Sequence, residues 1–304
     1  MPQADSDSPP PGEEEAAAET VDALVPARVR RRQESAALRE RVLQTAVEMV
    51  GQMDALTIGI EDLSMEQVIR EAQAPRSSVY RLWPYRGDFT DDVLVALASP
   101  QHMSNLAFDE ETTEGAEQDA ANVRAEDLAD PEFRRVLTQT LVRKWALFDL
   151  QRLTASREWQ EYIALIAGTQ FVRSIDARER LAIELQKCER TFIERMATFY
   201  ESMSKMLGLR LRPGLTYRHL ALALAAILEG VALRQTLVAA TKDTPRRLLT
   251  NAEQDWTLAE IVEQPLETDS PPPTEEADQW HLATYAFQAI LDGFTEEDPN
   301  YTPA

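Results

Sequence analysis

The side chains between residues 76 and 81 have the types and spacing that best suit binding chemistry in this chain. Arginine, serine and tyrosine side chains fall on one face of a predicted helix, whereas Val79 and Leu82 share the opposite face. Arginine can donate two hydrogen bonds to one guanine, and serine can hydrogen-bond to either base of a pair. The polar face is typical of a helix that lies in the major groove of duplex DNA, and its members are Arg76, Ser77, Ser78, Tyr80 and Arg81.

Two short helices joined by a tight turn are predicted to hold this face. The first helix begins at Ser64 as N-cap, with Gln67 completing a capping box. The second runs from about Pro75, which is tolerated at a first helical position, to the residue before Pro84. Val79, Leu82 and Trp83 are assigned to the small core beneath the polar face.

The segment from Ala72 to Phe89 resembles the signature of the tetracycline-repressor (TetR) family of bacterial transcription regulators. The matching positions are Ala72, Val79, Tyr80, Trp83, Arg86 and Phe89. Upstream, Arg39 to Val50 resembles the helix that packs across the pair in that family, so the resemblance covers about residues 36 to 98. It implies an N-terminal three-helix helix-turn-helix DNA-binding head, a connecting helix, and a helical body that senses a ligand and forms a dimer.

Two positions in the turn depart from the family pattern. Gln73 stands where the family commonly has glycine, and Pro75 stands where it commonly has serine. A residue other than glycine would cost about 1–2 kcal/mol if the left-handed geometry were kept. The turn therefore either keeps that geometry at a cost or has a different shape. Loss of a serine N-cap removes roughly 1 kcal/mol unless neighbouring groups replace it.

The resemblance and the side-chain chemistry together suggest a division of roles on DNA. Base-edge contacts are expected from the arginines and serines of the second helix, namely Arg76, Ser77, Ser78 and Arg81. Phosphate contacts are expected from Tyr80, Arg86 and Thr57. A basic cluster before the first helix could reach phosphates or a minor groove, or could be only a solvated stretch; it contains Arg28, Arg30, Arg31 and Arg32.

The distribution of charge matters because the net charge of −21 disfavours a nucleic-acid partner when taken as a whole. Residues 28 to 86 hold ten Arg and no Lys against eight Asp plus Glu, which leaves this segment at +2 and the rest of the chain at −23. A slightly basic module on an acidic body can bind phosphate locally, while the acidic body limits nonspecific binding. Acidity also keeps a long-tailed protein soluble.

Catalytic and metal-binding functions find little support. The three histidines, His102, His219 and His281, lie in separate segments without metal-like spacing, and there is no glycine-rich phosphate loop or nucleophile elbow. We therefore expect no enzymatic activity, no metal and no cofactor. A single cysteine, Cys188, suits a reducing compartment, so a cytoplasmic location is predicted. The longest apolar run, Leu220 to Leu228, is too short for a membrane span, so no membrane partner is expected.

The chain is predicted to be all-α and to divide into four parts. Residues 1–27 are acidic, proline-rich and predicted to be disordered; 28–84 form the head, 85–99 the connecting helix and 100–296 the body. In the body, Asp109 to Gln118 is predicted to be an acidic loop. Helices are expected from Pro131, with Asp130 as N-cap, and over about 155–175. A long helix is expected after Asp176, as N-cap with Glu179 as its capping-box partner, to about Gly208. Further helices are expected over 217–241 and 276–291, with a flexible acidic loop at about 250–279.

Dimerisation is expected through helices at about 178–207 and 217–241, because the second is apolar on more than one side. A wholly internal core helix would give the same pattern. Aromatic residues at helical spacing could line a pocket for a small effector, although such residues more often form only a core; the candidates are Trp145, Phe148, Trp159 and Tyr162.

The sequence therefore favours a homodimeric DNA-binding regulator, most simply a repressor released from a palindromic operator by a small molecule. The alternative is a helical protein-interaction module of the same fold that has lost specific DNA binding. The turn departures and the acidity favour that alternative, and the arginine, serine and tyrosine face opposes it.

Overall fold

The computed structural model describes residues 27–52, 63–100, 102–103, 110–172, 174–241, 257–266 and 279–303. Thr57, the acidic segment 1–26 and most of the loop at 250–279 lie outside the described residues. The chain forms two compact units, residues 1–97 and 98–304, which are called unit 1 and unit 2 below. The boundary places the predicted connecting helix within unit 1.

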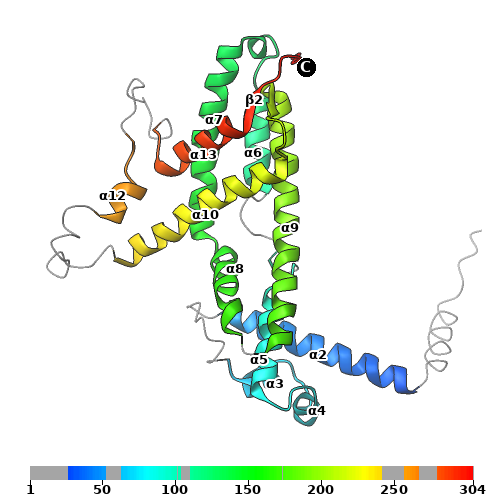
Figure 1. The fold of residues 1–304 in the computed structure, drawn as a ribbon. Coiled ribbons are helices and arrows are strands. Elements are labelled where there is room, and N and C mark those ends of the chain that lie inside the picture. Colours follow the sequence, from blue (N-terminus) through cyan, green and yellow to red (C-terminus); the bar gives the residue numbers. More distant parts are fainter. Residues whose placement is uncertain are drawn as a thin grey trace, which may run out of the picture. The chain divides into compact units, whose positions relative to one another are not determined.

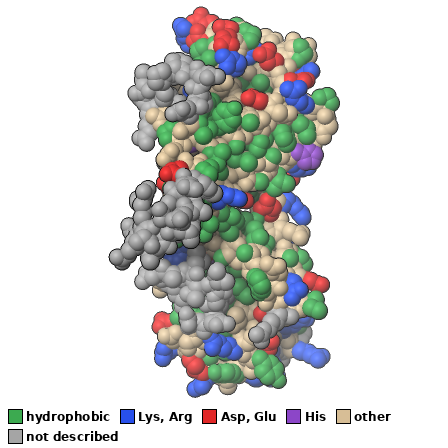
Figure 2. Space-filling view, turned by 60° about the vertical axis from the view of Figure 1, so that its left-hand side comes forward, with side chains coloured by type: hydrophobic (Ala, Val, Ile, Leu, Met, Phe, Trp, Pro, Cys, Tyr) green, Lys and Arg blue, Asp and Glu red, His purple; other side chains and the backbone are tan. Residues whose placement is uncertain are grey.

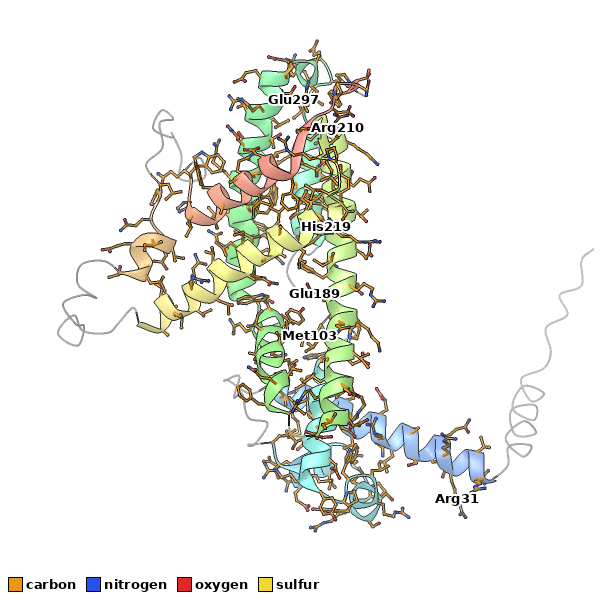
Figure 3. All side chains as sticks on the ribbon, viewed as in Figure 1. Arg31, Met103, Glu189, Arg210, His219 and Glu297 are labelled. Carbon is orange, nitrogen blue, oxygen red and sulfur yellow. The ribbon has the colours of Figure 1, made fainter. Side chains whose placement is uncertain are left out.

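Unit 1 contains four helices among its described residues: α2 (Ala27–Gly51), α3 (Met65–Glu71), α4 (Arg76–Leu82) and α5 (Arg86–Leu97). Their buried side chains meet in one core, in which Val42 and Ala46 of α2 lie with Val68 of α3, Val79 of α4 and Val93 of α5. The basic cluster at residues 28–32 was predicted to precede the first helix and instead lies within α2. Arg31 is placed near the end of α2 that extends away from α5 (Figure 3).

The two short helices begin slightly differently from the prediction. Ser64 is the N-cap of α3, but its side chain makes no capping hydrogen bond, so the predicted capping box with Gln67 is wrong. The backbone instead closes the first turn, because the Gln67 amide donates to the Ser64 carbonyl oxygen at 2.9 Å. Pro75 is the N-cap of α4 and not its first helical residue.

Unit 2 is mostly helical. Its long helices are α7 (Pro131–Ala155), α9 (Ile175–Met206) and α10 (Tyr217–Thr241), and α10 packs against α7, α9 and α13 (Leu282–Phe294) (Figure 1). The helix expected over 155–175 is shorter: α8 covers Arg157–Gly168, and a 3-10 turn follows at Thr169–Phe171. The structure confirms Asp130 as the N-cap of α7, since its side chain accepts a hydrogen bond from the Glu132 amide.

Three expectations for unit 2 were wrong. The predicted acidic loop at 109–118 is the helix α6 (Glu110–Ala121), which packs on α7. The N-cap of α9 is Ser174 and not Asp176, because the serine hydroxyl accepts from the Ala177 amide. The described chain is also not wholly helical, since β1 (Leu209–Leu211) pairs antiparallel with β2 (Thr295–Glu297).

The helix predicted to end the chain also differs in its bounds, since α13 covers Leu282–Phe294 and not 276–291. Before it lies α12 (Leu258–Val262), in which Thr257 and Glu260 form a capping box. The helix α10 is long and apolar enough over residues 217–240 to cross a membrane by length and composition alone, contrary to the expectation from the run 220–228. In the structure it is a packed helix of unit 2, with Leu220, Leu224 and Leu228 buried.

Candidate nucleic-acid interface and internal cavity

The turn between α3 and α4 resolves the question raised by Gln73. Its φ angle is +49°, so the left-handed geometry is kept although the residue is not glycine. The Ala74 amide donates to the Ile69 carbonyl oxygen at 3.0 Å and the Gln73 amide to that of Arg70 at 3.2 Å, which closes the end of α3. These hydrogen bonds and the core beneath the turn therefore offset the conformational cost of the left-handed Gln73.

The polar face of α4 is exposed. Arg76, Ser77, Tyr80 and Arg81 face solvent, Ser78 is partly exposed, and Val79 on the opposite side is completely buried. The Arg81 guanidinium donates to the Ser78 hydroxyl at 3.0 Å. The face defined from the sequence is thus presented as one surface by a helix that the core holds from behind.

The indole of Trp83 fixes the end of α4 against two other helices. Its Nε1 donates to Oδ2 of Asp92 on α5 at 2.7 Å, and the Arg39 guanidinium of α2 contacts the same oxygen at 2.7 Å. Trp83 also packs edge to face on Phe89, with ring centroids 5.4 Å apart. Asp92 therefore joins α2, α4 and α5, and so holds α4 in position.

A glutamate that the sequence interpretation did not single out lies on the α4 surface. Glu66 of α3 accepts a hydrogen bond from the Tyr80 hydroxyl at 2.5 Å and pairs with the Arg76 guanidinium at 2.7 Å. The Arg76 guanidinium also stacks over the Tyr80 ring at 5.6 Å. Two of the candidate DNA-binding side chains are thus held by a carboxylate. Glu66 lies ten residues before Arg76 and fourteen before Tyr80, on a different helix, so helical spacing gave no sequence signal for these contacts.

The remaining basic candidates of unit 1 are exposed. Arg86 lies at the start of α5, and the arginine cluster lies on the first turns of α2, where every described side chain up to residue 37 faces solvent. The side chains of this cluster are Arg28, Arg30, Arg31 and Arg32. The cluster is therefore a helical extension with basic side chains and not an irregular arm.

Unit 2 encloses a cavity between α7, α9, α10 and α13. It has a volume of about 80 Å³ within a free space of about 680 Å³ that includes its mouth. Of the aromatic residues predicted to bind a ligand, Trp145 lines it. Phe148, Trp159 and Tyr162 do not line it. Trp159 and Tyr162 are buried on α8, and Phe148 packs edge to face against Trp145. Three rings that were not among those four line the cavity: Phe199, Tyr200 and Phe287.

The cavity also holds a buried carboxylate, Asp149, with 5% of its surface exposed. The sequence interpretation missed it. The sequence pattern that could have identified Asp149 is a charged residue within the apolar stripe of α7. The stripe consists of Val142, Ala146, Asp149 and Leu153 at three- and four-residue spacing, and all four are buried.

A second buried polar group lies outside the cavity lining. The Tyr162 hydroxyl of α8 donates to Oε2 of Glu189 on α9, and burial together with this hydrogen bond raises the pKa of Tyr162. Tyr162 is thus a polar contact between α8 and α9. The same Glu189 also affects α10: burial, and secondly the charge of Glu189, raises the pKa of Glu229 to about 7.

The histidines do not gather. His102 contacts Oε2 of the buried Glu161 at 3.0 Å, and Arg157 donates to its other oxygen at 3.0 Å. Burial alone would raise the pKa of Glu161, but these two hydrogen bonds lower it below its usual value. In the described residues no group of three or more His, Cys, Asp or Glu side chains is placed to hold a metal ion.

Cys188 is buried on α9, where its Sγ donates to the Ala98 carbonyl oxygen at 3.3 Å. Burial raises the pKa of this thiol, which lowers its reactivity at neutral pH. Comparison of the chain with protein-family models, with curated proteins and with solved structures found no match.

Proposed function

We propose that this chain is a sequence-specific DNA-binding transcriptional regulator of the tetracycline-repressor type, acting in the cytoplasm as a homodimeric repressor that a small molecule releases from a palindromic operator. The observation that carries the proposal is the exposed arginine, serine and tyrosine face of α4, supported from behind by buried Val79 and Trp83. A helix supported in this way can enter a major groove without losing its core contacts.

The turn supports this proposal. The positive φ of Gln73 keeps the tight connection from α3 to α4 that such a motif needs, although glycine is absent. Gln73 itself is exposed, so its side chain meets no steric barrier from the core. This turn supports the proposal that α3 and α4 form the helix-turn-helix of a DNA-binding head.

The dimer is the second part of the proposal. The outer face of α10 exposes three leucines at helical spacing: Leu222 is 53% exposed, Leu233 40% and Leu237 60%. Figure 2 shows hydrophobic side chains gathered on this part of unit 2. Pairing of two such faces would bury them and would set the separation of two α4 helices, which a palindromic site fixes at about 34–36 Å for adjacent major grooves.

The experiment that tests the proposal is selection of bound sequences from a random duplex library by the purified full-length protein, at low and at physiological salt. We expect enrichment of a palindrome. Arg76→Ala is expected to cost about 1–3 kcal/mol and to relax one operator position, because a bidentate base contact is lost. Arg86→Ala is expected to weaken all sequences alike and to reduce the salt dependence, because a phosphate contact is lost.

Equal and sequence-independent losses from Arg76→Ala and Arg86→Ala would contradict this division of roles. Failure to enrich any motif at either salt concentration would contradict the regulator itself.

Glu66 gives a further test of the α4 surface. Its carboxylate holds Arg76 and Tyr80 and would repel a nearby phosphate, so Glu66→Gln is expected to raise DNA affinity. The pair is exposed, and such pairs contribute about 0.2–1 kcal/mol, so the expected gain in DNA affinity is at most about five-fold at low salt. Fluorescence anisotropy with a labelled duplex measures it. Glu71→Gln, which removes an exposed carboxylate from the same helix, is the control and is expected to give the smaller change.

The same contacts favour a second function, a helical protein-interaction module that has lost specific DNA binding. In that case Glu66 would hold Arg76 and Tyr80 permanently, and the acidic remainder of the chain would bind a protein partner. This alternative predicts no duplex affinity for wild type at low salt and no gain in Glu66→Gln, so the anisotropy titration separates the two functions.

A further inference from the structure

The cavity of unit 2 is lined mainly by apolar side chains. Its aromatic walls include Trp145 of α7, Phe199 of α9 and Phe287 of α13. Aliphatic side chains form much of the remaining lining, among them Leu141, Val142, Ala146, Leu228 and Leu291. Apolar ligand surface that leaves water for such walls gains about 25 cal/mol per Å². The lining therefore favours the apolar part of a ligand.

Polar side chains of the lining are engaged within the protein. The Thr138 hydroxyl donates to the Arg134 carbonyl oxygen at 2.8 Å. Asp149 also interacts within the protein, so its carboxylate is not a free charge for a ligand. The Tyr200 ring packs edge to face on Phe287, with ring centroids 6.3 Å apart. A buried water needs about two to four polar partners, so an apolar group suits this lining better than water does.

The size of the cavity limits the body of the ligand. Its volume of about 80 Å³ lies within a free space of about 680 Å³ that includes the mouth. The enclosed part suits one ring or one branched alkyl group. A larger ligand would have to extend into the mouth.

One aromatic wall depends on a glycine of α6. A Cβ atom at Gly115 would lie 2.1 Å from the Trp145 ring, so glycine allows this close approach. The Trp145 Nε1 donates to Oδ2 of Asp119 on α6 at 2.9 Å, and the Lys144 ammonium lies 4.8 Å from the ring centroid. These contacts position the wall before a ligand binds, which lowers the ordering cost of binding.

We infer that the cavity binds a small apolar molecule, whose single ring or branched alkyl group lies against Trp145, Phe199 and Phe287 and is recognised by apolar contact. That this ligand acts as the releasing effector rests on the proposed regulatory function, whereas its binding does not.

The test uses two uncharged probes of the same shape, ethylbenzene and benzyl alcohol, which differ by a methyl group in place of a hydroxyl. Titration of the full-length protein is followed by calorimetry and by tryptophan fluorescence, since Trp145 lines the cavity. Wild type is expected to bind ethylbenzene at least about ten-fold more tightly, because burial of a hydroxyl in an apolar site costs about 1–3 kcal/mol. Trp145→Phe is expected to lose the fluorescence change and to keep the calorimetric binding.

Two substitutions narrow the cavity from different helices. Ala116→Leu on α6 and Ala146→Leu on α7 each place a larger side chain in the lining, and each is expected to weaken ethylbenzene at least five-fold. Either variant suffices if the other does not fold. The matched control is Ala155→Leu, which makes the same change at an exposed position of α7 and is expected to keep the wild-type affinity within about two-fold.

Equal binding of the two probes by wild type, tighter binding of benzyl alcohol, or no binding of ethylbenzene up to its solubility limit would overturn the inference. Wild-type affinity for ethylbenzene in a folded narrowed variant would show that the probe binds elsewhere and would overturn it as well. The comparison of the two probes needs no variant. These titrations contain no DNA, so their outcome is independent of the library selection that tests the proposed function.

Discussion

Raising the pH from 4 to 8 is expected to lower the unfolding free energy of wild type by about 3 kcal/mol relative to that of Glu229→Gln. Burial, and secondly the charge of Glu189, raises the pKa of Glu229 to about 7 in the folded protein, against a usual value of 4.5. This difference of about 2.5 units corresponds to roughly 3 kcal/mol at 1.36 kcal/mol per unit.

The sign follows from proton binding. Between pH 4.5 and 7 the folded state keeps the Glu229 proton, whereas the unfolded state has released it, so the folded state binds more protons. The contribution of Glu229 to stability is therefore fully present below pH 4.5 and is lost as the pH rises toward 7. Above pH 7 both states are ionised and the loss is complete.

Urea denaturation of wild type and Glu229→Gln at several pH values measures this difference. The matched control is Glu179→Gln, which changes an exposed carboxylate on α9 and is expected to run parallel to wild type. Parallel curves for wild type and Glu229→Gln would mean that Glu229 is not protonated at pH 5 to 6. Glu189→Gln is expected to move the midpoint of the loss to lower pH, because the second cause of the raised pKa is removed.

The double substitution Leu233→Glu and Leu237→Glu is expected to convert the proposed dimer into a monomer and to weaken operator binding by roughly 100-fold or more. Both leucines are exposed on α10, so a charge there costs the isolated chain little, whereas two charged residues from each subunit would meet in the interface. The loss in DNA affinity is large because two linked reading helices bind one palindrome as a bivalent unit.

Sedimentation velocity and operator titration measure the two effects in the same preparations. Ile166→Glu is the control, since Ile166 is 46% exposed on α8 and lies outside the α10 face. A dimer that survives the double substitution would refute the α10 interface. A monomeric wild type would refute the homodimer, while the behaviour of single-site DNA probes would still report on α4.

Local patterns of apolar and capping residues in the sequence predicted several helices of this protein and the side on which they are buried. The spacing of Val79, Leu82 and Trp83 against Arg76 and Arg81 predicted which side of α4 is buried, because helical periodicity is a property of neighbouring residues. The bounds of α10 at 217–241 and the N-cap of α7 at Asp130 were also predicted correctly. Apolar periodicity and capping act within one or two turns, so the sequence contains them directly.

Tertiary structure decided what depends on residues far apart in the chain. Core packing and hydrogen bonds kept Gln73 in the left-handed region, where intrinsic preference would have favoured glycine. The pairing of β1 with β2 joins segments more than eighty residues apart, and the acidic segment 110–121 becomes a helix that packs on α7. Glu66 on the α4 surface, Asp149 in the cavity and Glu189 beside Glu229 are likewise contacts between helices. Helical spacing orders the side chains along one helix, but only the packing of several helices decides which of them share a low-dielectric site.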